Sequence, residues 1–127
     1  MHPAPLLFTA LLLLWCGPVS ATAAGSPELS VAQFVAQHPA NGEYTLIAYI
    51  DEIYLCPPCP KGAQCKPCIG DNITISDNPP RAATPTTEKI TVFITPSDGA
   101  KLQTSRRYRL RIALAGSLRL RDGEQMP

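Results

Sequence analysis

The sequence predicts a single all-β domain that carries one short helix near its N-terminus. Three observations lead to this fold class: the chain has 14 prolines among 127 residues, its central segments are rich in β-branched and aromatic residues, and its C-terminal third alternates apolar with polar residues. Proline interrupts long helices, and alternation with period two is typical of strands that bury one face. A chain of this length is too short for a two-domain enzyme.

Residues 1–24 are predicted to be a secretory signal peptide. The apolar run 6–16 is too short to span a bilayer, and small residues follow it. We therefore expect a single mature domain, residues 25–127, in the periplasm or outside the cell and without a membrane span. A signal anchor is the alternative, because no Lys or Arg precedes the apolar run. Cleavage is expected after Ala21, Ala23 or Ala24.

The charge balance gives no general attraction to nucleic acid. The chain has 11 Lys and Arg against 10 Asp and Glu, a formal net charge of +1, so nucleic acid is the less favoured class of partner. Hydrophobic residues make up 45% of the chain, which excludes a disordered polyelectrolyte. Beyond the leader only His38 remains among the histidines, and there is no Gly-rich phosphate loop. We therefore expect neither an enzyme nor a bound cofactor.

The elements of the first half follow from local patterns. Residues 28–37 have apolar residues near helical spacing, with Ser30 as the expected cap and a stop at His38. Residues 44–56 are apolar on both faces and predict a long strand buried on two sides, with a bulge at Asp51-Glu52. Further along the chain we expect a strand at 73–76, a Pro/Thr-rich loop at 77–88, a strand at 89–95 and an irregular segment at 96–105.

The C-terminal third has the clearest periodicity. Even positions from Tyr108 to Leu120 are apolar except Gly116, whereas five of the eight odd positions from Arg107 to Arg121 are arginine. This pattern predicts strands with an arginine stripe outside and a turn near residues 115–117. A three-residue loop would place Leu114 opposite Leu118 and keep apolar residues on one face; a continuous bent strand also fits.

This succession of elements resembles the OB-fold, a five-stranded Greek-key barrel, over roughly residues 30–121. The resemblance extends to small secreted or periplasmic proteins that carry a cysteine loop on this fold. Two features depart from it: residues 96–105 look too irregular for the helix that often precedes the fourth strand, and the chain ends soon after the fifth strand begins. A small β-sandwich is the alternative architecture.

The four cysteines beyond the leader all lie in residues 56–68. An even number of cysteines in an exported chain predicts disulfides, and four cysteines allow three connectivities. The spacing favours nested bridges, because both pairs then share Gly62 as their midpoint, as in a hairpin. The expected bridges are Cys56 to Cys68 and Cys59 to Cys65.

Two other uses of these cysteines are alternatives. The first CxxC pair resembles CPPC-like variants of the thioredoxin family, which need a helix after the first cysteine to lower the thiol pKa; Pro57, Pro58 and Pro60 disfavour such a helix. Two CxxC pairs could also supply four thiolates to zinc, but the separator of five residues is much shorter than usual. We therefore expect no metal.

Basic side chains are the candidate ligand-binding residues. Arginine binds phosphate or carboxylate groups through two parallel hydrogen bonds, and in the OB-fold the first loop between strands borders the ligand face. The stripe can equally be a solvated face. Tyr44, Tyr49 and Tyr54 are candidate stacking residues or core. The candidate ligand-binding residues are Lys61, Lys66, Arg107, Arg109, Arg111, Arg119 and Arg121.

The sequence as a whole predicts an exported, non-enzymatic binding module. Its stapled loop and basic face would engage an anionic or protein partner. The alternative is a periplasmic thiol-disulfide or metal-binding protein that uses the four loop cysteines.

Overall fold

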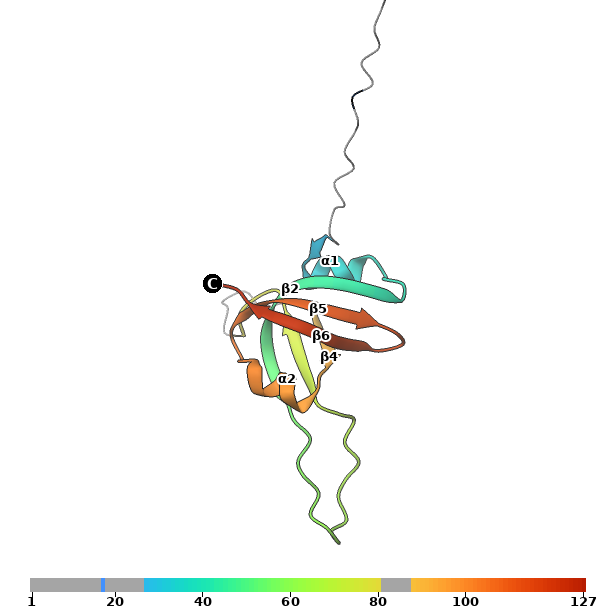
Figure 1. The fold of residues 1–127 in the computed structure, drawn as a ribbon, viewed down its shortest axis with the longest axis vertical. Coiled ribbons are helices and arrows are strands. Elements are labelled where there is room, and N and C mark those ends of the chain that lie inside the picture. The colour runs from blue at the N-terminus through green and yellow to red at the C-terminus, as the bar shows by residue number, and fades with distance from the viewer. Residues whose placement is uncertain (1–16, 18–26, 81–87) are drawn as a thin grey trace, which may run out of the picture.

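A computed structural model describes Gly17, residues 27–80 and residues 88–127. The predicted signal peptide, apart from Gly17, and most of the predicted loop 77–88 lie outside the described residues. The described elements in chain order are β1 (Glu28–Leu29), α1 (Val31–Ala36), β2 (Gly42–Tyr54), β3 (Asn72–Ser76), β4 (Lys89–Phe93), α2 (Pro96–Lys101), β5 (Arg107–Leu114) and β6 (Leu118–Gln125), as Figure 1 shows. The protein is therefore mostly β, as predicted, with two short helices.

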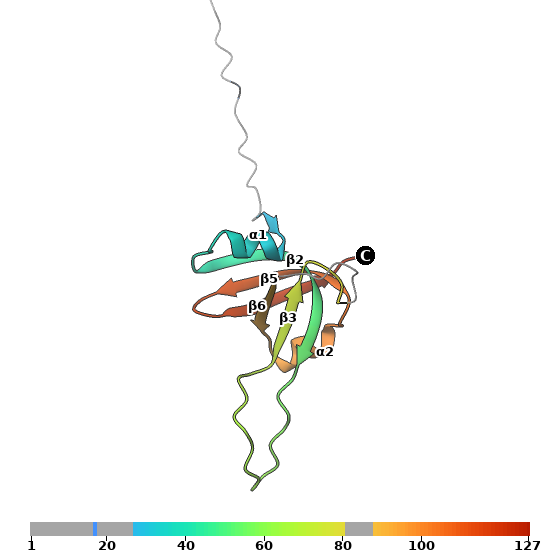
Figure 2. The same cartoon turned by 180° about the vertical axis from the view of Figure 1, so that it is seen from behind.

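Five of the six described strands close into a ring (Figures 1 and 2). The order around the ring is β2, β3, β4, β6, β5 and back to β2. The long strand β2 makes this closure, because its residues 42–49 pair with β5 and its residues 49–54 pair with β3. Strand β1 adds to β2 in parallel outside the ring, and β4 meets β6 through the single pair Phe93–Arg119.

The predicted bulge in β2 is present at Asp51. The register between β2 and β3 shifts between Ile50 and Glu52, and Asp51 forms an ion pair with Lys89 at 2.7 Å. A bulge bends its strand and changes which side chains face inward. Before the bulge the buried residues are Leu46, Ala48 and Ile50, whereas beyond it Ile53 packs on the core and Glu52 is exposed. The bulge thereby turns the last even residues of β2 outward.

Helix α1 begins with the predicted cap but is shorter than predicted. Ser30 accepts a hydrogen bond from the backbone N–H of Gln33, and the Gln33 side chain accepts one from the N–H of Ser30. The preceding residues pair with β2 as β1, so the expected helix 28–37 is wrong at its start.

The second face of β2 is only half-buried, which corrects the expected burial on two sides. The half-buried residues on it are Thr45, Ile47 and Tyr49.

The C-terminal hairpin follows the predicted register. Leu114 lies opposite Leu118 and Ile112 opposite Leu120 across a three-residue turn, so the continuous bent strand is not formed. The even-numbered apolar residues of this hairpin enter the core, where Leu110 and Ile112 are fully buried. The other fully buried large hydrophobic side chains come from α1, β2, β3 and β4: Val31, Leu46, Ile50, Ile73, Ile75 and Val92.

Two expectations for the C-terminal part are wrong. Residues 96–101 form helix α2, because Thr95 and Asp98 make a reciprocal capping box and Pro96 occupies the first turn. Strand β6 also continues beyond Arg121 to Gln125; its polar last residues pair with β5 through their backbone, which hydropathy alternation does not reveal. Residues 96–105 thus include a helix, and the last strand is 8 residues long.

Asp77 ties helix α1 to the end of β3. Its carboxylate accepts hydrogen bonds from the N–H groups of Val31 at 2.6 Å and Ala32 at 3.0 Å. A carboxylate at this place satisfies two unpaired donors and complements the positive end of the helix.

We predict that Asp77→Ala lowers the free energy of unfolding by about 1–2 kcal/mol, because both donors lose their partner. Asp122→Ala is the matched control: Asp122 is exposed and paired only with exposed Arg111, so its loss should change stability by less than about 0.5 kcal/mol. Urea unfolding followed by circular dichroism measures both changes, and equal effects would contradict the assigned cap.

Candidate functional site

Residues 55–71 form an arm that projects from the ends of β2 and β3 (Figures 1 and 2). The ladder between these strands stops at the pair Tyr54–Asn72. Four prolines within the arm have no N–H to continue it. Every residue from 57 to 69 is exposed, so no hydrophobic core orders this segment.

Two nested disulfides hold the arm together. The structure joins Cys56 to Cys68 and Cys59 to Cys65, the pairing expected from the spacing, and the Cα atoms of each pair are 5.9 Å apart. At the tip, the N–H of Ala63 donates to the carbonyl of Pro60 at 3.0 Å, and Gly62 has a φ of 87°, as the third residue of a type II turn requires. Thiol exchange or metal binding by these cysteines would require the bonds to open first.

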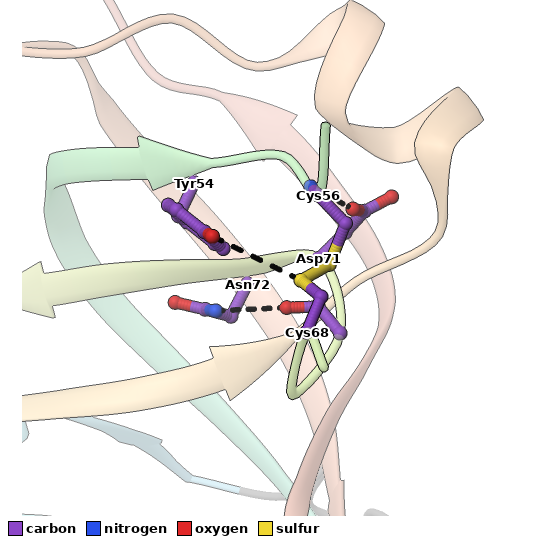
Figure 3. The surroundings of a disulfide bond; sticks show 6 residues. Tyr54, Cys56, Cys68, Asp71 and Asn72 are labelled. Atoms are coloured by element: carbon purple, nitrogen blue, oxygen red, sulfur yellow. Dashed lines mark hydrogen bonds between the residues drawn. A yellow bond between two sulfur atoms is a disulfide. The ribbon is translucent and has the colours of Figure 1, made fainter. Parts of the chain in front are cut away.

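Hydrogen bonds anchor the base of the arm (Figure 3). The Asp71 carboxylate accepts from the N–H of Cys56 at 2.7 Å, and the Asp71 carbonyl accepts from the N–H of Ile94 at 3.0 Å. The Asp71 side chain therefore stands in for a ladder bond that the strands no longer make. On the other side of the bridge, the Tyr54 hydroxyl lies 3.9 Å from Sγ of Cys68.

Asn72, the acceptor position of an Asn-Ile-Thr sequence, is part of this base. Its side-chain amide donates to the carbonyl of Gly70 at 2.9 Å, and the residue is only 8% exposed (Figure 3). An N-glycan requires an accessible asparagine. In the folded protein Asn72 is therefore a structural residue of the arm base.

A row of four side chains crosses the outer face of the sheet below the arm. Register pairs connect Tyr54 on β2 with Asn72 on β3, Asn72 with Phe93 on β4, and Phe93 with Arg119 on β6. The Arg119 guanidinium lies 5.9 Å from the centre of the Phe93 ring, within the range of a cation–π contact. A Cβ on Gly70 would lie 3.5 Å from the same ring, so the arm base packs directly on this cross-strand row.

A hollow of about 350 Å³ lies between the arm base and the outer face of β2 and β3. Tyr54 is 44% exposed and Ile69 77% exposed, and both line it. The bulge at Asp51 makes this hollow, because without it Tyr54 would face the core. The lining residues are Glu52, Tyr54, Pro67, Cys68, Ile69, Asn72 and Thr74.

The basic candidates fall into two groups. Exposed Lys61 and Lys66 lie on the arm, and neither forms an ion pair with any described residue. Arg107 on β5 is also exposed and unpaired among the described residues, and Arg119 belongs to the cross-strand row. The remaining arginines are paired with acids: Arg109 with Glu28 and Glu124, Arg111 with Asp122 at 2.8 Å, and Arg121 with Glu43 at 3.6 Å.

The arginine stripe is therefore a face of mixed charge. The hydrogen bond and the charge of Glu28 raise the pKa of Arg109. In both views the arm points away from β5 and β6, so the structure does not bring Arg107, Arg109 and Arg111 to the arm lysines. Arg119 is connected to the arm base through Phe93, against which Gly70 packs.

The three candidate tyrosines have different roles. Tyr44 packs edge-on against Phe34, with ring centres 5.1 Å apart, and its hydroxyl donates to the carbonyl of Ala40. Tyr49 is half-buried, and only Tyr54 presents an exposed ring. The site residues that sequence reasoning missed are Ile69, Asp71 and Phe93; the Gly70-Asp71 turn signal before a strand was the available clue to one of them.

No helix among the described residues is long and apolar enough to cross a membrane, and no group of three or more potential ligand side chains among them is arranged to hold a metal ion. The two disulfides are typical of an oxidising compartment outside the cytoplasm. No protein-family model, curated protein or solved structure matches this chain.

We predict that the isolated protein has a mass four hydrogens below that of the reduced chain and unchanged by chelators. Trypsin cleaves after Lys61, between the two CxxC pairs, so nested bridges should keep both halves of the arm in one species under non-reducing conditions. Partial reduction and alkylation then separates nested from crossed bridges. Release of two separate peptides, each with its own CxxC bridge, would contradict the structure.

Proposed function

We propose that this protein is an exported, non-enzymatic binding module that engages its partner through the disulfide arm and the sheet face below it. The partner is anionic where it meets the arm. The observation that carries the proposal is a fully exposed segment that is nevertheless held rigid by two disulfides and four prolines. A rigid segment loses little conformational entropy when it binds a partner. Because the arm is exposed, its fixed shape contributes to recognition and not to the packing of the core.

The fold proposed for this module is an OB-fold-like barrel. The ring of five strands supports it, because one long bent strand pairs with β5 at one end and β3 at the other. Helix α2 also precedes the fourth strand of the ring, at the place where the OB-fold often has one. In a β-sandwich, two separate sheets would face each other without this continuous pairing.

The location of the candidate residues supports binding at this face. In the OB-fold the first loop between strands borders the ligand face, and the arm is that loop. Lys61 and Lys66 supply positive charge that no described acid neutralises, while Arg119 and Tyr54 extend the surface across the strands. The paired arginines of β5 are assigned to the solvated surface instead.

Thiol-disulfide exchange is the second candidate function. Cys59 and Cys65 are exposed near the tip of the arm, where a reductant has access to them. Resistance to reduction distinguishes the two candidates: bridges that glutathione reduces would favour exchange, whereas bridges that stay intact in glutathione favour binding.

We predict that Lys61→Gln/Lys66→Gln elutes from heparin, a generic polyanion, at lower salt than the unaltered protein. Removing positive charges that contact a polyanion lowers the salt needed for release. Arg109→Gln/Arg111→Gln is the matched control: it removes the same formal charge, but from side chains that already pair with acids.

Heparin chromatography at neutral pH with a salt gradient measures the effect. The control should elute close to the unaltered protein. If the unaltered protein is not retained at low salt, or if the control shifts as far as the arm variant, the proposed binding face is wrong.

A further inference from the structure

The large apolar side chains that are exposed in the described protein all lie at the base of the arm: Tyr54, Leu55 and Ile69. Leu55 already has a neighbour, because its side chain lies against Gly99 of α2, 2.8 Å from where a Cβ would stand. Tyr54 and Ile69 instead line the hollow on the other side. Apolar groups held in fixed, solvated positions mark a contact surface.

The hollow is lined by an acidic residue, whereas the charged side chains of the arm, apart from Asp71 at its base, are basic. Glu52 lies in the lining of the hollow, whereas residues 53–70 contain Lys61 and Lys66 and no carboxylate. The nearest acid on the arm side, Asp71, is engaged by the N–H of Cys56. A complementary occupant is therefore uncharged near Glu52 and negative beside the lysines.

In the half of the arm that leads from the tip back to β3, some backbone N–H groups have no hydrogen-bond partner among the described residues. The backbone N–H groups of Gln64, Cys65 and Lys66 form no hydrogen bond with any described residue. An extended segment with unpaired N–H and C=O groups is able to pair with a second extended chain. The disulfides hold these groups in place before binding.

We propose that the arm and hollow bind an extended acidic polypeptide segment. One apolar side chain of the segment fills the hollow against Tyr54 and Ile69, and carboxylates that follow it lie beside Lys66 and Lys61. This inference rests on the proposed function and specifies its partner. A nucleic acid fits less well, because its backbone carries a charge at every nucleotide and would place one against Glu52.

The test uses the exported protein with both disulfides intact. The probe is a fluorescein-labelled synthetic peptide with one leucine followed by alternating glutamate and serine. Its controls are the same peptide with serine for leucine, the same peptide with glutamine for glutamate, and a single-stranded oligothymidylate of equal net charge. Fluorescence anisotropy gives each dissociation constant, and ¹⁵N amide shifts locate the contact.

We expect the leucine–glutamate peptide to bind about tenfold more tightly than the peptide without leucine, the difference that burying one such side chain produces. Ile69→Ser should weaken binding about tenfold. Leu55→Ser, the matched control, removes an exposed apolar side chain of equal size outside the hollow and should change affinity less than about twofold. Lys61→Gln/Lys66→Gln should weaken binding and reduce its salt dependence.

The outcomes separate the inference from the function on which it rests. If the peptide does not bind at millimolar concentration while heparin retention still depends on the arm lysines, the polypeptide inference is wrong and the proposed function stands. Tighter binding of oligothymidylate, or equal effects of Ile69→Ser and Leu55→Ser, also overturns the inference. Absence of both peptide binding and heparin retention overturns both. Amide spectra of each variant confirm that it remains folded.

Discussion

The double pairing of β2 is the constraint on which the rest of the structure depends. This strand hydrogen-bonds to β5 along its first part and to β3 along its second, and the bulge at Asp51 separates the two parts. The bulge bends the strand and allows a single sheet to return on itself. The same bulge exchanges the inward and outward positions, so that Ile53 closes the core while Tyr54 joins the outer surface. Closure of the ring and formation of the hollow therefore have one local cause.

The interactions that stabilise the arm differ from those that stabilise the ring of strands. Backbone pairing and burial of apolar side chains stabilise the ring, and both end at the pair Tyr54–Asn72. Beyond that pair the order of the chain comes from covalent bonds, prolines and the side chain of Asp71. Closing a loop of about 13 residues with a disulfide contributes on the order of 3 kcal/mol in the chain-entropy model, less where prolines already restrict the reduced chain. The protein thus keeps an exposed segment in a fixed shape without burying it.

Charge is distributed so that the two basic regions differ in character. Arg109 and Arg111 of β5 lie opposite Glu124 and Asp122 of β6, which neutralises this part of the hairpin's outer face, while Arg107 stays unpaired among the described residues. The arm lysines have no such partners among the described residues. Since exposed ion pairs contribute little to stability, the pairing of Arg109 and Arg111 matters chiefly for the field that the surface presents to a partner.

Apart from β1 and the polar end of β6, local patterns in the sequence predicted the strands, the bulge, the hairpin register and the pairing of the cysteines. Each of these follows from a short-range rule: period-two alternation, an acidic pair inside an apolar run, an odd loop that keeps Leu114 and Leu118 on one face, and a shared midpoint at Gly62. What only the tertiary structure decided is which side chains meet. Arg119 lies over Phe93, Ile69 comes beside Tyr54, and acids from β1 and β6 neutralise Arg109. These contacts join residues far apart in the chain, and they depend on which strands pair around the ring, which local patterns do not specify.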